Sequence, residues 1–245
     1  MRGIPVSKTP QVSRSDVLAM LAALVLVVLF LTLRMPGYRP SLLSIAVPVA
    51  FAAIAWLLQG VNLTGAIAGA AVAFIFYSNG GWQLFILLLI VFAITFVATK
   101  IGTAKKKTIE IRKGFGRSGS QVMANLFVAA AFLSIADVVI ARYIAMGAAI
   151  AALAELAADT VSSELGEAFG RPTYLMTTWK PAATGTNGGI SLLGTIAGIF
   201  SAVLVAAAAF ALNILDSKVW ICAVAGTVGM IVDSLLGATL ENRGK

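Results

Sequence analysis

Residues 17–33 read VLAMLAALVLVVLFLTL, an apolar run without a charged side chain. A helix needs about 20 such residues, with a range of roughly 17–25, to cross the hydrocarbon core of a bilayer. Arg14 precedes the run, Arg34 ends it, and it lacks a clear small-residue cleavage site. It therefore predicts a membrane anchor and not a signal peptide.

Seven further apolar runs follow. We expect membrane spans at residues 17–33, 41–58, 62–77, 82–98, 121–139, 143–158, 188–212 and 218–240. Composition agrees, because 60% of the 245 residues are hydrophobic and 11% are charged, whereas soluble domains carry about 25% charged residues. The sequence predicts an all-α integral membrane protein, a polytopic bundle of about eight (seven to nine) transmembrane helices in a single domain, 1–245.

The basic residues predict the orientation of these helices. With the N-terminus inside, 14 of the 18 Lys and Arg residues fall on predicted inside segments, which are 1–16, 59–61, 99–120, 159–187 and 241–245. Cytoplasmic loops collect Lys and Arg, so we expect both termini and the polar working face on the cytoplasmic side. The net charge of +8 then reflects topology, and we expect no nucleic-acid partner.

Several reaction classes are excluded by composition. The chain has no histidine and one cysteine, Cys222. A Ser-His-Asp triad, an HExxH zinc site, a CxxC metal site and an intrachain disulfide are therefore absent. Catalysis would have to use carboxylates, Lys, Arg, hydroxyls, backbone amides or a metal ion held by oxygen.

Acidic residues inside spans are costly and mark candidate sites. Glu155 and Asp159 are four residues apart and share a helix face, which Ser162 extends if the helix continues. Asp233 lies about 10 Å from the inner end of the last span. Asp159 and Asp233 can therefore meet at a similar depth in the membrane, and two neighbouring carboxylates need a counter-ion. Mg²⁺ is a suitable counter-ion, because carboxylates and substrate phosphates are its usual ligands. The alternative is an acid hydrogen-bonded or ion-paired to a neighbouring helix. Asp137, five residues before Arg142, is expected to be an interfacial or paired residue.

Two cytoplasmic segments have the character of anion sites. Thr177–Lys180 is followed by the glycine-rich stretch 185–191, which leads into a span. Glycines let backbone approach a ligand, and a helix N-terminus favours anions; the alternative is a turn capped by Thr186 or Asn187. The other segment, 112–121, is basic and glycine-rich, with Asn125 one turn further on. Its GxGxxG match carries no weight because no strand precedes it.

Small residues recur in the spans and predict close helix packing. They include Gly65, Gly69, Gly194, Gly198, Gly226 and Gly229.

Taken together, these motifs resemble one membrane family. The stretches are Asp159-Thr160-Val161-Ser162-Ser163-Glu164-Leu165-Gly166, Thr177-Thr178-Trp179-Lys180, Gly185-Thr186-Asn187-Gly188-Gly189-Ile190-Ser191 and Asp233-Ser234-Leu235-Leu236-Gly237-Ala238, with Arg112-Lys113 upstream. The family includes the plant chloroplast phytyl-phosphate kinase. The likeness covers about 100–241, so we expect generic helices over 1–98 and a catalytic half over 99–241.

The resemblance implies phosphorylation of an isoprenoid (phytyl or prenyl) monophosphate by a nucleoside triphosphate, with CTP favoured by a further likeness to polyprenol and phytol kinases. We expect Asp159, Lys180 and Asp233 to be catalytic and Asp159, Glu164 and Asp233 to bind Mg²⁺. We expect the phosphate- and substrate-binding residues to be Arg112, Lys113, Arg117, Asn125, Ser162, Ser163, Thr178, Gly185, Thr186, Asn187, Gly188, Gly189 and Ser191.

Two other functions fit the same sequence. A lipid nucleotidyltransferase would release pyrophosphate from CTP and form a CDP-lipid. A lipid or anion transporter would use acids at the membrane midplane and glycine-broken helices, but the charged residues concentrate on one predicted face. In each case membrane lipids are partners, and a homo-oligomer is compatible with the sequence.

Overall fold

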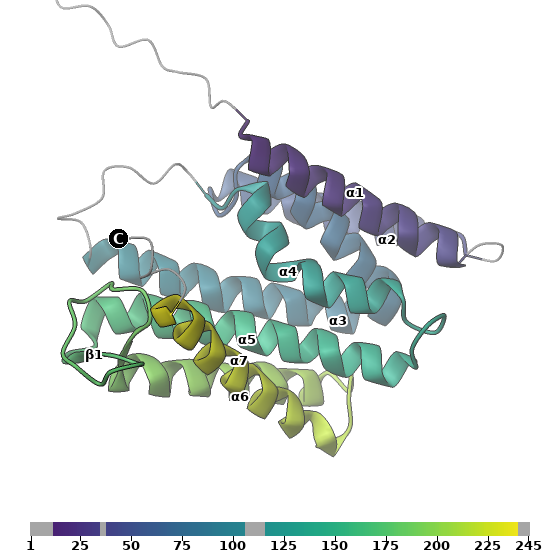
Figure 1. Cartoon of the computed structure of the whole chain (residues 1–245). Coiled ribbons are helices and arrows are strands. Elements are labelled where there is room, and N and C mark those ends of the chain that lie inside the picture. Colours follow the sequence, from purple (N-terminus) through teal and green to yellow (C-terminus); the bar gives the residue numbers. More distant parts are fainter. Residues whose placement is uncertain (1–11, 35–37, 106–115, 240–245) are drawn as a thin grey trace, which may run out of the picture.

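The computed structural model describes residues 12–34, 38–105 and 116–239. Within them the chain is mainly helical (Figure 1). The helices are α1 (Arg14–Arg34), α2 (Leu42–Leu57), α3 (Leu63–Lys105), α4 (Gly119–Ser134), α5 (Arg142–Phe169), α6 (Leu192–Ala211) and α7 (Trp220–Thr239), which follows the short 3-10 helix η1 (Ser217–Val219). Strands β1 (Thr173–Leu175) and β2 (Gly189–Ser191) form a small antiparallel sheet.

Helix α3 is a helical hairpin and not a straight rod. Gly81 has φ 61° and ψ −152°, a backbone conformation that suits glycine. Gly65 and Thr95 line one pocket, although a straight helix would separate them by about 45 Å at 1.5 Å per residue. The predicted spans 62–77 and 82–98 are therefore the two arms of this hairpin.

The helices have the length and composition of membrane spans. Five of those described, α1, α3, α5, α6 and α7, are long and apolar enough to cross a bilayer, and α2 and α4 are shorter apolar helices. Each predicted apolar run overlaps one of these helices, with two runs in α3. The predicted helical membrane architecture is thus confirmed apart from the small sheet of β1 and β2, whereas the number of helices that cross the membrane stays a prediction.

The described parts of the predicted cytoplasmic segments gather at one end of the bundle, where α1 and α4 begin and α5 and α7 end (Figure 1); we call it the basic end. There the Ser120 backbone N–H donates to Asp16 Oδ1 at 3.1 Å. Likewise, the backbone N–H of Arg117 donates to the Gly60 carbonyl at 3.0 Å. The charge count placed these segments on one side of the membrane, and the fold brings them together. Which compartment that side faces stays a prediction.

The opposite end is held together by four polar residues from three segments. Arg34 Nη2 donates to Asn79 Oδ1 at 2.6 Å. Arg142 donates through Nη1 to the Asn79 carbonyl at 2.8 Å and through Nε to Asp137 Oδ2 at 2.7 Å. The predicted pairing of Asp137 is confirmed. These bonds tie α1, the α3 turn and the α4–α5 connection into one unit.

We expect Arg142→Leu to lower the stability of the fold without touching the basic end. The part-buried bond to the Asn79 carbonyl is worth about 1.5–3 kcal/mol and the exposed ion pair with Asp137 about 0–1 kcal/mol, and the variant removes both. Thermal unfolding of the purified protein in detergent would show a lower midpoint. Arg39→Leu removes an exposed basic residue near the same end and is the control.

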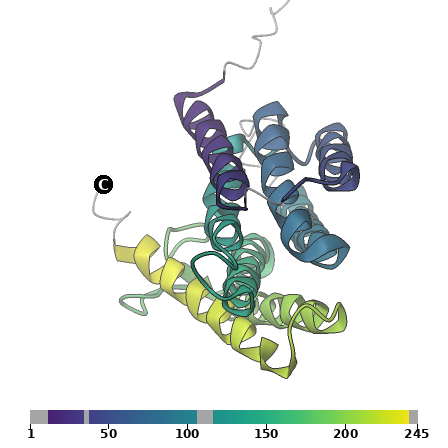
Figure 2. The ribbon, with the colours of Figure 1, turned by 90° about the vertical axis from the view of Figure 1, so that its right-hand side faces the viewer.

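Helix α5 is the central element. It packs against α3 and α4 on one side and α6 and α7 on the other (Figure 2). Its Leu153 and Ala157 are fully buried. A Cβ on Gly198 would lie 2.9 Å from the Ala158 carbonyl, and one on Gly226 would lie 2.7 Å from the Ala154 Cβ. The small residues of α6 and α7 therefore allow close packing against α5, as predicted.

The structure corrects the predicted extent of α5. The sequence placed the span at 143–158 and a loop at 159–187, whereas the helix runs on to Phe169. It ends at Gly170, two residues before Pro172, whose ring disfavours helical backbone in the residue before it. The polar residues from Asp159 to Glu167 therefore project from a helix, at spacings that the helix dictates.

Candidate active site

A polar pocket of about 370 Å³ opens at the basic end. Helix α5 supplies one wall and α7 another, and the glycine-rich stretch 185–191, which ends in β2, supplies a third. The lining residues include Asp159, Ser162, Ser163, Gly166, Glu167, Thr173, Thr184, Gly185, Thr186, Asn187, Gly188, Gly189, Ser191, Asp233, Ser234 and Gly237. Three predicted motifs, far apart in the sequence, thus form one site.

Two carboxylates from different helices meet in this pocket. Asp159 on α5 is half-buried, Asp233 on α7 is exposed, and the two interact electrostatically. In the part of the chain that the structure describes, neither accepts a hydrogen bond nor pairs with a basic side chain. Neighbouring carboxylates repel each other unless a cation or proton compensates. The pair is therefore suited to a bound cation.

Glu155 extends the acidic face one turn deeper into the bundle. It interacts electrostatically with both Asp159 and Asp233. A Cβ on Gly229 would lie 2.5 Å from the Glu155 Cγ, so α7 approaches this side chain closely because position 229 is glycine. No group of three or more acidic or cysteine residues within metal-binding range occurs in the described ranges. A metal ion here would rely on two carboxylates completed by other oxygens.

The glycine-rich stretch docks onto α7 through Gly188. This residue has φ +72°, and a Cβ there would lie 2.3 Å from the Ala238 Cβ and 2.4 Å from its backbone nitrogen. Gly185 also has a positive φ, +83°, but a Cβ there would come no closer than 3.8 Å to Glu167. Gly188 is therefore required for both conformation and space, and Gly185 for conformation alone.

The strands fix the other end of this stretch. Thr173 pairs with Ser191 and Leu175 with Gly189. Ser191 then caps α6, its Oγ accepting the Gly194 backbone N–H at 3.2 Å. Thr186 lies in the turn before β2, where its Oγ1 donates to the Ala183 carbonyl at 2.7 Å, as the alternative interpretation of this stretch expected.

Two predicted residues lie outside the pocket. Lys180 and Thr178 are exposed and do not line it. They belong to a turn after β1, in which the Lys180 carbonyl accepts the Leu175 backbone N–H at 2.9 Å. We expect Lys180→Ala to change the turnover rate less than about tenfold, or 1.4 kcal/mol. Steady-state rates would test this, and a loss as large as that of an Asp159 variant would contradict it.

Glu164 and Arg117 also lie apart from the two aspartates. Glu164 is on α5, where a Cβ on Gly102 of α3 would lie 2.3 Å from its Oε2. It acts electrostatically on Arg117, whose pKa is lowered by burial and raised by this carboxylate. The predicted metal set of Asp159, Glu164 and Asp233 is therefore not brought together. The predicted Arg112 and Lys113 lie outside the described residues.

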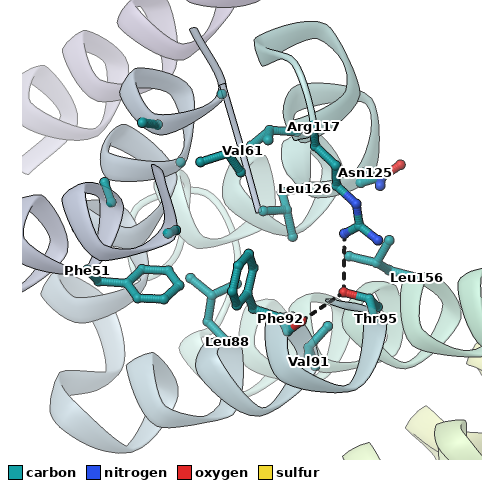
Figure 3. A pocket seen from close by; sticks show the side chains of 16 residues that line it. Phe51, Val61, Leu88, Val91, Phe92, Thr95, Arg117, Asn125, Leu126 and Leu156 are labelled. Carbon is teal, nitrogen blue, oxygen red and sulfur yellow. Dashed lines mark hydrogen bonds between the residues drawn. The ribbon is translucent and has the colours of Figure 1, made fainter. Parts of the chain in front are cut away.

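Arg117 and Asn125 line a second pocket, of about 60 Å³, between α2, α3, α4 and α5 (Figure 3). Arg117 Nη1 donates to Thr95 Oγ1 at 3.1 Å. The remaining lining is almost entirely apolar and includes Phe51, Leu88, Val91, Phe92 and Leu126. The sequence counted both residues, with those of the glycine-rich stretch, among the phosphate- and substrate-binding residues, and the structure places them in a different pocket.

Sequence reasoning missed Glu167, Thr173 and Ser234, which line the polar pocket. Glu167 follows Ser163 by four residues and Asp159 by eight, so the helical period would have identified it had α5 been extended. Ser234 is adjacent to Asp233. Thr173 belongs to strand β1, and three residues are too few to show an alternating pattern in the sequence.

The architecture and the site define a polytopic helical membrane protein with an acidic, glycine-covered pocket at one end. The chain belongs to the family described as integral membrane protein DUF92, which matches residues 46–245. The match begins within the second predicted span, so the family extends beyond the motif-bearing half.

Curated relatives agree with this family. An uncharacterized membrane protein of Methanocaldococcus jannaschii is 32% identical over 181 residues, 74% of each chain. Protein VTE6, chloroplastic, of Arabidopsis thaliana is 30% identical over 201 residues, 76% of this chain and 58% of the relative. Protein PGR of the same plant is 28% identical over 216 residues, 76% and 74% of the two chains. The predicted family resemblance is confirmed. No solved structure matches.

Proposed function

We propose that this protein is a membrane kinase that transfers a phosphoryl group from a nucleoside triphosphate, with CTP the favoured donor, to an isoprenoid monophosphate. The product is the isoprenoid diphosphate. The observation that carries the proposal is the meeting of Asp159 and Asp233 beneath the glycine-rich stretch. Three of the stretches that resemble the phytyl-phosphate kinase family, at 159–166, 185–191 and 233–238, contribute residues to this pocket.

The residues present fit Mg²⁺. This ion is bound in phosphotransfer sites by one or two carboxylates together with substrate phosphates and water, and Asp159 and Asp233 are two carboxylates without a described cationic partner. Ser162, Ser163 and Ser234 add hydroxyl oxygens to the same lining. Bound there, Mg²⁺ would offset the negative charge of the nucleotide phosphates.

The volume and the polar lining of the pocket support a site for a nucleoside triphosphate. Its volume of about 370 Å³ falls within the 300–1,000 Å³ typical of small-molecule pockets. Gly185 leaves room for a phosphate to approach the backbone, because a Cβ there would meet no atom closer than 3.8 Å. Ser162, Thr184 and Ser234 offer hydroxyl groups in the same lining. Phosphoryl transfer needs positioning and charge stabilisation more than covalent chemistry, and this chain supplies both without histidine.

In the proposed reaction, a phosphate oxygen of the isoprenoid monophosphate forms a bond to the γ-phosphorus of the donor. The bond from that phosphorus to the β-phosphate oxygen breaks, and the nucleoside diphosphate leaves. The second pKa of a phosphate monoester is near 6, so the acceptor is already anionic at neutral pH. A catalytic base is not required, which favours a monophosphate acceptor over a free alcohol.

The decisive experiment combines purified protein with Mg²⁺, each nucleoside triphosphate and a panel of prenyl monophosphates, with products read by mass spectrometry. We expect a prenyl diphosphate and a nucleoside diphosphate in equal amounts. A CDP-lipid with pyrophosphate would establish the nucleotidyltransferase alternative. If no donor–acceptor pair gives a diphosphate, the kinase proposal fails.

A further inference from the structure

The turn after β1 carries a motif that the polar pocket does not use. Thr178 and Lys180 are exposed and do not line the pocket. Trp179 between them is the most exposed tryptophan of the chain, with 69% of its surface accessible. The turn lies at the basic end, beyond the last residues of α5, where β1 is drawn in Figure 1. A large aromatic side chain thus projects outwards beside the opening of the site.

The backbone of Trp179 has a conformation that bulky residues rarely adopt. Its φ is +54°, in the left-handed region, where a side chain with a Cβ costs free energy. Two hydrogen bonds close the turn around it: the Trp179 N–H donates to the Leu175 carbonyl at 2.8 Å, and the Leu175 N–H donates to the Lys180 carbonyl at 2.9 Å. The fold therefore keeps the indole outside at a cost, which favours a function for the indole itself.

The four tryptophans of the chain lie at the two ends of the bundle. Trp56, near the end of α2, and Trp179 are at the basic end. Trp82, beside the Gly81 turn of α3, and Trp220, the first residue of α7, are at the opposite end. All four are at least 49% exposed. Tryptophan is enriched at both membrane–water interfaces, so the distribution indicates that the turn lies at the level of the lipid head groups.

The charges around Trp179 suit an anionic lipid surface. Lys180 follows it directly, and Arg171 lies just before β1; both are exposed. Within the part of the chain that the structure describes, neither forms an ion pair with a carboxylate. Tyr174 adds a second exposed aromatic ring on β1. Basic residues at the membrane surface attract anionic head groups, and aromatic rings occupy the layer just beneath them.

The turn is also joined to one wall of the polar pocket. The Met176 N–H donates to the Gly188 carbonyl at 3.1 Å, and Leu175 of β1 pairs with Gly189 of β2. Gly188 is the residue through which the glycine-rich stretch docks onto α7. A contact that fixes the turn therefore also restricts movement of this wall.

We propose that residues 176–180 form an interfacial anchor. The Trp179 indole enters the head-group layer of the membrane, Lys180 lies against anionic head groups, and the anchored turn steadies the glycine-rich stretch at the pocket. The inference goes beyond the proposed kinase activity, because it concerns a contact between this turn and the lipid surface and holds whatever reaction the pocket performs. It gives the motif Thr177–Lys180 a place at the membrane and not in the pocket.

Tryptophan fluorescence tests the position of the indole. The full chain is reconstituted in vesicles of equal parts dioleoyl phosphatidylcholine and dioleoyl phosphatidylglycerol, and the signal of Trp179 is the difference between the natural chain and Trp179→Phe. We expect phosphatidylcholine brominated on its acyl chains to quench this signal. Acrylamide, which reports exposure to water, should quench it about 2- to 10-fold less than it quenches N-acetyltryptophanamide, as expected for an interfacial indole.

A chain that combines Trp56→Phe, Trp82→Phe and Trp220→Phe keeps Trp179 alone and repeats the measurement without subtraction. Acrylamide quenching as strong as that of N-acetyltryptophanamide, with no effect of the brominated lipid, would place the indole in water and overturn the proposal.

Amide hydrogen exchange in the same vesicles tests the link to the pocket wall. We expect Trp179→Ser to speed exchange over residues 182–189 by about 5- to 50-fold, because a segment that loses an anchor opens locally more often. Trp220→Ser removes an exposed tryptophan at the opposite end and should leave this exchange unchanged. Unaltered exchange in Trp179→Ser would show that the turn does not steady the wall and would contradict the proposal. Neither measurement uses nucleotide, so failure of the kinase proposal would be seen separately.

Discussion

Asp159→Asn is expected to reduce diphosphate formation by about 10²–10³-fold, the range seen when one electrostatic stabiliser is removed from an active site. The substitution keeps size and hydrogen-bonding capacity but removes the charge that faces Asp233. Initial rates in proteoliposomes, at saturating nucleotide and prenyl monophosphate, would measure it. The Mg²⁺ concentration needed for half-maximal rate should rise in Asp233→Asn for the same reason.

Glu164→Gln is the matched control, because it makes the same change of charge on the same helix outside the polar pocket. We expect its rate to stay within about tenfold of the unmodified protein, or 1.4 kcal/mol. Equal losses in both variants would mean that the charge of α5 as a whole matters and that Asp159 has no particular role. Thermal midpoints of the two proteins would show whether either loss reflects unfolding.

Much of the fold could be predicted from hydrophobic runs and basic residues. Each run overlaps a helix, and the segments assigned to one side meet at one end, as the bond between Ser120 and Asp16 shows. The end of α5 was misplaced because the polar residues after Asp159 were interpreted as loop chemistry. Packing against α6, through Gly194 and Gly198, keeps that stretch helical despite its polarity.

The candidate site was predictable where a helical period governs it and unpredictable where tertiary packing does. Spacing alone placed Asp159 and Ser162 on one face of α5. Glu164 contacts α3 because α3 passes close to α5 at Gly102. The crossing of two helices cannot be predicted from the local sequence pattern of either one. Arg117 shows the same limit, because its direction is set by backbone bonds to Gly60 and Asn62.

Gly188→Ala is expected to damage the site from a distance, by displacing the glycine-rich stretch from α7. A left-handed backbone costs a residue with a Cβ about 1–2 kcal/mol, and overpacking adds about 1–3 kcal/mol. The new Cβ would meet the Ala238 backbone, which cannot turn aside as a flexible side chain can. We expect a lower thermal midpoint and a rise in the KM for nucleotide, since Asp233 lies one turn and a half before Ala238.

Gly185→Ala separates these two causes. Its φ of +83° is as unfavourable as that of Gly188, but the nearest atom to a Cβ there is 3.8 Å away. It should therefore show the conformational cost alone, a loss of about 1–2 kcal/mol in stability with little change in the KM for nucleotide. If both variants raise that KM equally, backbone flexibility of the stretch controls nucleotide binding, and its docking onto α7 does not. A larger effect at Gly188 would make the contact with α7 the element that closes the pocket over its ligand.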